Sequence, residues 1–418
     1  MKRQHLILLN LIAFLGFSCA AWAAGDQPIV PAWKAVPNKI VNQAGLKPEK
    51  KLPANPGTLA DCFSEDDLTR ARGRDKTMAG ARLCGADLQG AVLQDVDFSG
   101  ASLAGANLSG ANLRGANLSG ANLIGVNLTQ ADLENANLSG ARLVNAELVG
   151  ARLVNINGEK ADLSRAKMVE ADLTGASFKQ ATLVRVDLTR ANLFRAGFYQ
   201  TNMERAVLTH ASMVDAEDHG SINMLETNLT YANLDHVNMG SHGNYASLSK
   251  ANLTEASCRN ARMGWVRLNE ATCFRTDFSG AMLKRAYLNR TNAQRAVFNQ
   301  ADVSGLQGEG ADLSFAHFKN ANLSGAELKA ANLGSADLRD ANLAQAKAND
   351  ASFKAAMLQN ADCTKAKFAR ADFEGANITG ANFEDANVFH ARFDTIWKNY
   401  LKDQDLYASQ YKDIEWIE

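Results

Sequence analysis

The sequence predicts an all-β solenoid, in which the chain winds into square coils that stack on one another. From about Met78 to Phe393 the chain repeats every five residues, as in 106–110, 111–115 and 116–120. A five-residue period fits neither a helix nor the simple two-residue alternation of a strand. Each repeat also carries one small and one large apolar residue. We therefore expect a backbone that turns a corner every five residues, so that four sides close a coil of about twenty residues.

Two inward-facing slots account for the apolar residues of each repeat. The large slot holds Leu, Phe, Met or Ile, beginning with Leu83, and the slot two residues earlier holds Ala or another small residue. A narrow core packed to native density has room for one large side chain per wall only if its inward neighbour is small. Asn or Asp lies between the two slots, where it tolerates turn conformations and can hydrogen-bond the local backbone.

The repeat reads Ala-(Asp/Asn)-Leu-x-x, and it is matched from Ala81 through nearly all of 78–393. In this respect the chain resembles the pentapeptide-repeat family. The resemblance implies a right-handed quadrilateral parallel β-helix, in agreement with the coil predicted from the residues. It also implies that end-to-end dimers occur among relatives, and that some cytosolic members imitate duplex DNA and protect DNA gyrase.

The first residues are typical of an export signal. A basic pair at the start is followed by an apolar core at 6–17 and a small-x-small cleavage site at 21–23. We therefore expect a signal peptide at 1–23 and a periplasmic or secreted mature protein. An uncleaved membrane anchor and a lipoprotein signal at Cys19 are the alternatives. No second segment is apolar enough to span a bilayer.

Two segments separate this signal from the repeats. Residues 24–57 form a Pro-rich linker that contains all six prolines. Residues 58–77 predict an N-terminal helical cap, with a short amphipathic helix from Thr58 to Gly73 and Thr58 or Asp61 as its N-cap. A cap is expected because the end of a solenoid exposes unpaired backbone, which promotes aggregation unless it is covered.

The five-residue phase breaks once, in the middle of the repeats. Met213 and Met224 are eleven residues apart, and Met239 and Leu248 are nine apart. We interpret this as a one-residue bulge followed, about one coil later, by a compensating one-residue shortcut. The two irregular corners should then lie near each other on adjacent coils.

Four of the seven histidines gather in this irregular segment, together with several aspartates. Histidine and aspartate are ligands of transition metals, and bulges recur near functional sites. The spacing matches no named ligand motif, so an irregular surface loop is the alternative. The candidate metal or ligand-binding residues are His210, Asp215, Asp218, His219, Asp235, His236 and His242.

The five cysteines that would remain after export fall into two groups. Three occupy the large slot, so we expect buried thiols that pack as small hydrophobic groups: Cys258, Cys273 and Cys363. Cys84 follows a large-slot residue and should point outward, and Cys62 lies just before the repeats. We expect these two to form a disulfide that pins the N-terminal cap to the first coil, as an oxidising compartment permits. Two free thiols are the alternative.

Arginines recur at one corner of the coil. Arg165, Arg185 and Arg205 are twenty residues apart and should stack, whereas Arg190 and Arg195 occupy the next two corners. This pattern predicts either an anion- or polysaccharide-binding stripe or a solvated surface, and the nearby aspartates favour the solvated surface.

Residues 394–418 abandon the five-residue period, and their apolar residues recur at helical spacing. We expect a C-terminal helical cap over the last coil. A partner or homodimer interface is the alternative, because aromatic residues are enriched in interface cores. The interface candidates are Trp397, Tyr400, Tyr407, Tyr411 and Trp416.

No catalytic or cofactor motif stands out from the repeats. The chain has no nucleophile motif with a recognisable local signature, no phosphate-binding loop and no zinc-spaced cysteine pair. A square coil with a filled core also leaves no interior pocket for a substrate. We therefore predict no enzyme and no cofactor, but an exported scaffold that presents a rigid surface to a protein or cell-envelope partner of unknown identity.

There are two alternatives to this function. A gyrase-binding DNA mimic needs strongly acidic surfaces, because the DNA that it replaces is a dense polyanion. The net charge of −1, the recurring arginines and the export signal argue against it. No nucleic-acid partner is expected from this charge balance. Metal or ligand binding within 210–243 is the second alternative.

Overall fold

The computed structural model describes residues 62–218, 222–241 and 244–418. The chain divides into two units, Met1–Asn55 and Pro56–Glu418, and all described residues belong to the second. The predicted signal peptide, the predicted linker and the start of the predicted N-terminal cap therefore lie outside the described residues. No helix of the described part is both long enough and apolar enough to cross a membrane.

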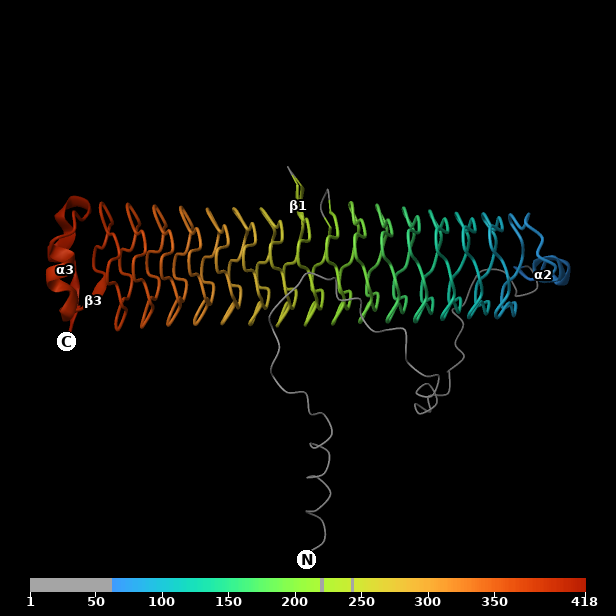
Figure 1. Ribbon diagram of the computed structural model, residues 1–418, viewed down its shortest axis with the longest axis horizontal. Helices are drawn as coiled ribbons and strands as arrows, with labels where there is room; N and C mark the ends of the chain where they lie inside the picture. Colours follow the sequence, from blue (N-terminus) through green and yellow to red (C-terminus); the bar gives the residue numbers. More distant parts are fainter. Residues whose placement is uncertain (1–61, 219–221, 242–243) are drawn as a thin grey trace, which may run out of the picture. The chain divides into compact units, whose positions relative to one another are not determined.

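Parallel β-bridges join each coil to the next. Thr77 pairs with Asp97, and the same twenty-residue step recurs as far as the pair of Asp372 and Arg392. Four such ladders run along the stack, which confirms the predicted square coil (Figure 1). Most rungs are isolated bridges because only the middle of each five-residue side is extended. We name the walls by one pair each: wall 1 by Asp97–Asn117, wall 2 by Ser102–Asn122, wall 3 by Asn107–Asn127 and wall 4 by Asn112–Asp132.

The local structure of a repeat follows from its residue types. The small Ala111 and the large Leu113 are both fully buried in the core, as predicted. Between them, the side-chain oxygen of Asn112 accepts a hydrogen bond from the backbone N–H of Arg114 at 3.1 Å. The fifth residue of each side then turns the corner with a positive φ, which is +63° at Gly115. Where the middle residue is Asn or Asp, its side chain supports the turn, and the left-handed residue completes the corner.

Departures from Leu in the core are compensated along the stack. The ring of Phe373 lies between those of Phe353 and Phe393, with centroids 4.8 Å and 4.4 Å away. At Gly308, which leaves the large slot empty, Leu306 fills the space, because a Cβ built on Gly308 would lie 3.4 Å from Leu306 Cδ2. Leu328 Cδ2 of the next coil also approaches the same point, to 3.1 Å.

Helix α2 (Glu65–Arg72) precedes the first coil. Its N-cap is Ser64, whose hydroxyl accepts the N–H of Asp67 at 3.2 Å, and Gly73 ends the helix as predicted. The predicted N-cap is wrong for α2. Thr58 and Asp61 precede α2 and lie outside the described residues, whereas three acidic residues after Ser64 favour a helix that begins there.

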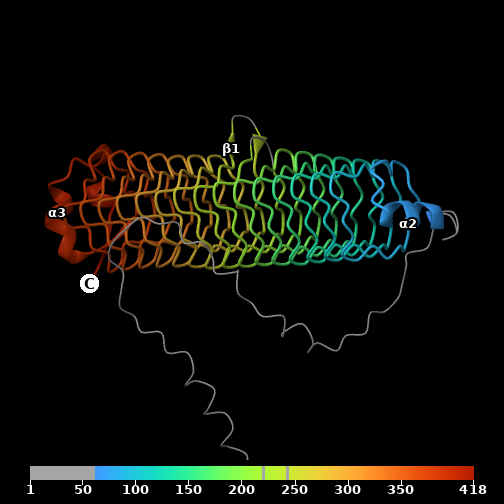
Figure 2. The same ribbon diagram turned by 45° about the vertical axis from the view of Figure 1, so that its right-hand side comes forward.

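Three contacts attach α2 and its N-cap to the first coil. Phe63 pairs with Leu83 in an antiparallel bridge, and the Ser64 N–H donates to the carbonyl oxygen of Arg82 at 2.8 Å. The N–H of Arg82 in turn donates to the Asp67 carboxylate at 2.9 Å. The side chain of Leu68, which belongs to α2, is buried against the apolar core. The helix is therefore packed on the first coil, in addition to being joined to it by the chain (Figures 1 and 2).

The C-terminal segment is only partly helical, which corrects the predicted helical cap. It comprises strand β3 (Arg392–Asp394), the 3-10 helix η1 (Thr395–Trp397), α3 (Lys398–Lys402), the 3-10 helix η2 (Tyr407–Asp413) and strand β4 (Glu415–Ile417). β4 pairs in parallel with β3, with Arg392 opposite Glu415. Because Arg392 belongs to wall 3, β4 adds one more rung to that wall, and the unpaired backbone of the last coil explains why a strand forms there.

Candidate functional site

Two consecutive coils are longer than twenty residues, and both insertions fall at the corner between walls 1 and 2. On wall 1, Glu217 pairs with Asn238, whereas the partners of these two residues on wall 2 are Asn223 and Ser247. The passage from Glu217 to Asn223 has one residue more than a regular side. The passage from Asn238 to Ser247 has four residues more.

The predicted one-residue bulge is therefore confirmed, and the predicted shortcut is wrong. The nine residues from Met239 to Leu248 are one repeat plus four extra residues, and not two repeats less one. Both interpretations restore the same five-residue phase. The predicted irregular corners, 219–221 and 240–243, lie partly outside the described residues, but the residues that flank them place both insertions on adjacent coils.

The four extra residues build a hairpin. Its strands β1 (Gly240–Ser241) and β2 (Asn244–Tyr245) are antiparallel, with Gly240 opposite Tyr245. Figures 1 and 2 both show β1 standing out from the edge of the coil stack. A Cβ on Gly240 would lie 3.0 Å from the backbone nitrogen of Gly264, so glycine permits the close approach of the hairpin base to the next coil.

The base of the hairpin is held by a stack of side chains on successive coils. The Tyr245 ring lies 5.4 Å from the Trp265 ring, and the Arg285 guanidinium lies 4.9 Å above the Trp265 ring. This stack is not among the features predicted from the sequence. The signal was present in the sequence, because the three residues recur every twenty positions at one corner.

On the opposite edge of wall 1 lies an open groove of about 760 Å³. It contains charges of both signs, contributed by residues on four consecutive coils. The lining residues include Arg195, Asp215, Glu217, His236, Asn238 and Arg262. Asp215 and His236, two of the predicted metal ligands, thus lie in the same groove on adjacent coils.

The other described candidates have separate surroundings. His210 turns the corner between walls 3 and 4, and its ring stacks on Tyr231 with centroids 4.9 Å apart. The Asp235 carboxylate binds Arg259, with Nη2 at 2.7 Å and Nε at 3.1 Å. Burial alone would raise the pKa of Asp235, but the hydrogen bonds from Arg259 and Ser257 hold it below its ordinary value.

Asp218 occupies a large slot and is buried, and its carboxylate accepts the N–H of Ile222 at 2.9 Å. His219 and His242 lie outside the described residues. Across 62–218, 222–241 and 244–418, no three or more His, Cys, Asp or Glu side chains are grouped so that they could hold a metal ion. Metal binding in this segment stays a prediction.

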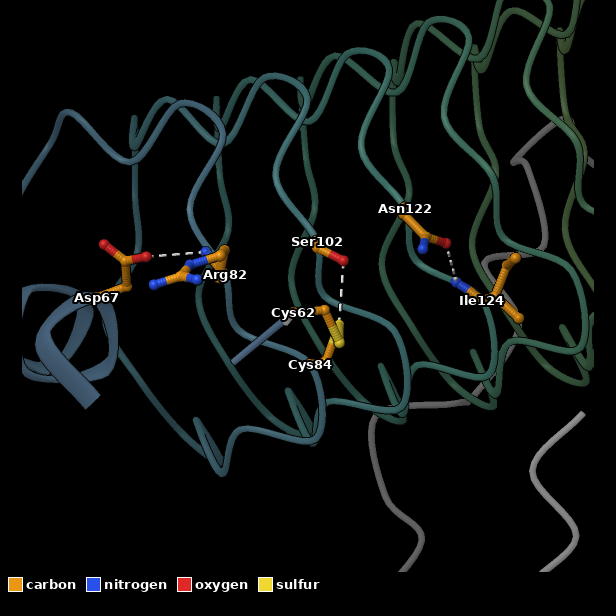
Figure 3. The surroundings of a disulfide bond; sticks show 7 residues. All are labelled: Cys62, Asp67, Arg82, Cys84, Ser102, Asn122 and Ile124. Carbon is orange, nitrogen blue, oxygen red and sulfur yellow. Dashed lines mark hydrogen bonds between the residues drawn. A yellow bond between two sulfur atoms is a disulfide. The ribbon is translucent and has the colours of Figure 1, made fainter. Parts of the chain in front are cut away.

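Cys62 and Cys84 are joined in a disulfide, with their Cα atoms 5.5 Å apart (Figure 3). The Cys84 N–H also donates to the Cys62 carbonyl oxygen at 3.0 Å, so backbone and side chain connect the same two positions. Cys84 was expected to face outward. It lies outside the apolar core, but it is only 4% exposed because Cys62 covers it and its sulfur lies 3.0 Å from Ser102 Oγ.

The remaining cysteines of the described part are buried in the core as predicted, at Cys258, Cys273 and Cys363. Burial raises the pKa of the Cys273 thiol to about 12. It also raises the pKa values of the other two thiols. These thiols remain protonated at physiological pH, so they are poor nucleophiles.

Four of the five C-terminal interface candidates pack on the end of the stack. Trp397 Nε1 donates to the Ala376 carbonyl oxygen at 3.0 Å, and the Tyr400 hydroxyl donates to that of Ala381 at 2.7 Å. Tyr411 and Trp416 contact each other and lie partly buried against the core. Only Tyr407, which is 55% exposed, remains accessible among the five.

The predicted arginine stripe lies at the corner between walls 2 and 3. Arg165 and Arg185 are exposed there, whereas Arg205 pairs with Glu226 at 2.7 Å. Arg190 and Arg195, at the next corners, face Glu170 at 3.3 Å and Asp215 at 4.0 Å. Three of the five arginines thus face a carboxylate, whereas Arg165 and Arg185 are exposed, so neither the anion-binding stripe nor the solvated surface is decided by these contacts.

Several solved structures are similar to this chain. HetL, a pentapeptide repeat protein involved in heterocyst differentiation regulation in the cyanobacterium Nostoc sp. strain PCC 7120, is 26% identical over 65% of this chain and 89% of its own, with a TM-score of 0.17. A pentapeptide repeat protein of the Arabidopsis thaliana thylakoid lumen is 24% identical over 32% and 70%, with a TM-score of 0.14. Full-length QnrB1, a plasmid-mediated fluoroquinolone resistance protein, is 15% identical over 60% and 94%, with a TM-score of 0.16.

Because these TM-scores are low, no argument about this chain rests on them. Among proteins with a curated description, none matches the chain. The sequence pattern described as pentapeptide repeats (8 copies), in contrast, matches in overlapping segments at 77–217, at 271–305 and at 309–394. These segments cover more than half of the chain, and the largest interval between them contains the two long coils. Together with the twenty-residue ladder, they show that this protein belongs to the pentapeptide repeat family, whose fold is a right-handed β-helix.

Proposed function

We propose that this protein is a non-enzymatic, exported interaction scaffold. The observation that carries the proposal is the position of the two insertions, at the same corner of two consecutive coils. Elsewhere in the described part the ladders keep the twenty-residue step, so this corner is where the surface departs most from the repeat. Binding residues concentrate on irregular segments that a rigid scaffold positions, and we place the surface for a protein or cell-envelope partner there.

Two observations support export. The first is the predicted signal peptide at 1–23. The second is the disulfide between Cys62 and Cys84, because disulfides persist in the periplasm and outside the cell and are rare in the cytosol. The two observations concern different parts of the chain, because the predicted signal lies at 1–23 and the disulfide joins Cys62 to Cys84.

We also propose that α2 and the C-terminal segment serve as caps. Leu68 of α2 and Leu401 of α3 are both buried, and β4 pairs with the exposed edge of the last coil. Covering both ends prevents uncontrolled pairing between stacks. Since four of the five C-terminal aromatic candidates pack inward, a homodimer through this segment is a weaker proposal than a partner at the hairpin corner.

Export and partner binding are tested together in cells. A photo-crosslinking amino acid replaces Tyr245 at the hairpin or, as a matched control, Gln180 at the same corner of a regular coil. We expect osmotic shock to release protein with the mass of a chain that begins at Ala24 or Gly25, and cross-links to an envelope component from position 245 only. Full-length protein confined to the cytosol, or a cross-link to gyrase, would refute the proposal.

A further inference from the structure

A second groove, of about 550 Å³, begins where the stack under the hairpin ends. The corner between walls 1 and 2 is occupied on successive coils by Tyr245, Trp265, Arg285, Gly305 and Gly325. The first three are large and stacked on one another, and the two glycines carry no side chain. The change from large side chains to glycine hollows the surface, so that Arg285, together with Trp265, forms one end of the groove, and both glycines line the rest of it.

The groove carries a net positive charge. Lys284 and Arg285 line it, both are exposed, and neither makes an ion pair with any described residue. The one carboxylate in the lining, Glu327, binds Lys347 at 2.7 Å and is thereby neutralised. Elsewhere on the stack, oppositely charged residues pair from coil to coil, as Lys167 does with Glu147 at 2.7 Å. Two unpaired cations facing one groove are therefore available for a bound anion.

Arg285 is held in place before any ligand arrives. Its guanidinium lies on one face of Trp265, and Tyr245 stacks against the same indole ring at an interplanar angle of 23°. A guanidinium that stacks on an aromatic ring keeps the N–H groups at its edge free, and these match the two oxygens of a carboxylate or phosphate. Prior ordering of the side chain reduces the entropy lost on binding.

The rest of the lining suits a ligand rich in hydroxyl groups. Ser304 and Ser324 provide hydroxyls, Gln307 provides an amide, and Tyr287 provides a ring with a polar tip. Tyr287, Gln307 and Glu327 are consecutive rungs of wall 2, so these groups are spaced by one coil. Such a row can donate to and accept from several hydroxyls of one ring or of a short chain of rings.

We propose that this groove binds an acidic carbohydrate. Arg285 and Lys284 hold its carboxylate or phosphate, and its ring lies over Gly305 and Gly325 within reach of the serine hydroxyls and the Gln307 amide. The inference deepens the proposed function by naming the chemical class of the envelope partner. The binding step itself requires neither export nor the hairpin contact that the cross-linking experiment examines.

The test uses a matched pair of arginines in one coil. Arg285→Gly removes the arginine at one end of the groove, whereas Arg290→Gly removes the same charge at the corner between walls 2 and 3, outside the groove lining. Gly305 and Gly310 already hold these two corners in the next coil, so both variants should fold. Thermal unfolding of each purified, disulfide-bonded protein checks this directly.

Binding is measured by calorimetry with three probes: an oligogalacturonate, a sugar phosphate and a neutral oligosaccharide of the same length as the first. We expect one or both acidic probes to bind, the neutral probe to bind at least tenfold more weakly, and Arg285→Gly to weaken binding tenfold or more. Arg290→Gly should stay within twofold of the natural protein. The stronger acidic probe identifies carboxylate or phosphate as the preferred group.

Three results would overturn the inference. Equal losses in the two variants would mean that the protein attracts anions without a site. Equal binding of the neutral probe would remove the role of the two cations, and tighter binding of a single-stranded oligonucleotide would make the ligand a nucleic acid. If the acidic probes fail while position 245 still cross-links an envelope component, the scaffold proposal stands and the carbohydrate site does not.

Discussion

Asn223 pairs with Ser247 on the neighbouring coil although the two are twenty-four residues apart, and Ser247 then pairs with Arg267 at the regular spacing of twenty. The ladder on wall 2 therefore continues unbroken past the hairpin. The chain leaves the coil and returns to it at the same corner. The four extra residues therefore do not shift any inward-facing slot.

Deleting residues 241–244 should consequently leave a folded protein. The deletion joins Gly240 to Tyr245, so that Met239 keeps the large slot and Ala246 the small slot of one regular repeat. We expect the free energy of unfolding to change by no more than about 1 kcal/mol, since stability in a solenoid comes mainly from contacts between neighbouring coils. Urea unfolding followed by circular dichroism measures it. Deleting 121–124 from a regular coil is the control, and it should be strongly destabilising because it puts the following residues out of phase.

The effect of a Gly→Ala substitution on stability should depend on whether the glycine lies at a left-handed corner. Gly110 has a φ of +64°, Gly197 does not have a positive φ, and a Cβ at either residue would meet nothing within 4 Å. Gly110→Ala should lower the free energy of unfolding by about 1 kcal/mol, because the left-handed conformation is strained for alanine. Gly197→Ala should raise it by about 0.5 kcal/mol through the entropy of the unfolded chain. Changes of the same sign in both variants would contradict this explanation.

The stacked phenylalanines should dominate the stability of the last coils. Phe373 is fully buried between two other rings, so Phe373→Ala should lower the free energy of unfolding by about 3–5 kcal/mol. Phe389 is 40% exposed on the same part of the stack, and Phe389→Ala should cost well under half as much. Chemical denaturation of the two variants compares them. A small effect at Phe373 would mean that the neighbouring rings collapse into the cavity.

The inner surface of the coil was predictable from the sequence, whereas much of the outer surface was not. One period determines the inward slots, so Ala111 and Leu113 needed no tertiary information. The interval from Met239 to Leu248 was ambiguous, because removing one residue and adding four restore the same phase. Arg285 and Trp265 recur at the regular spacing of twenty, but the five-residue pattern constrains only the inward slots and does not show which outward side chains stack.

The two ends were predictable in outline only. The C-terminal aromatic residues have helical spacing, yet Trp397 and Tyr400 use their polar atoms to satisfy carbonyl oxygens of the last coils. Strand β4 forms because wall 3 has a free edge there, and no local pattern in the sequence predicts that pairing. At the other end, Ser64 is as good an N-cap as Thr58 or Asp61, and the contact of Asp67 with Arg82 distinguishes it.

Reduction of the disulfide should loosen the first coil selectively. In the chain-entropy account, a cross-link between residues 22 apart stabilises by about 3 kcal/mol. The double variant Cys62→Ser, Cys84→Ser should therefore exchange its α2 amides faster, with exchange near Phe373 unchanged. Hydrogen exchange read by mass spectrometry resolves the two regions. Uniformly faster exchange would show that the bond supports the whole stack.

Thiol labelling should distinguish the two groups of cysteines. Without reductant, the mature native protein, which lacks Cys19 of the signal peptide, should react with no maleimide at neutral pH, because the core thiols are buried and the pKa of Cys273 is raised to about 12. After mild reduction, two thiols per chain should react, at Cys62 and Cys84. Labelling of Cys258, Cys273 or Cys363 before the protein unfolds would show that the core opens locally.

The ion pair between Asp235 and Arg259 should make the long coils sensitive to acid. Since the folded state holds the pKa of Asp235 below its unfolded value, the pair contributes its full stability above the unfolded pKa, near pH 4, and loses it as the pH falls through the folded pKa. Asp235→Asn should therefore lower the melting temperature at pH 7, and the difference from the natural protein should shrink towards pH 2. Asp215→Asn is the control, because its carboxylate is more exposed and lies 4.0 Å from Arg195. A difference that persists unchanged at pH 2 would assign the effect of Asp235→Asn to packing rather than to charge.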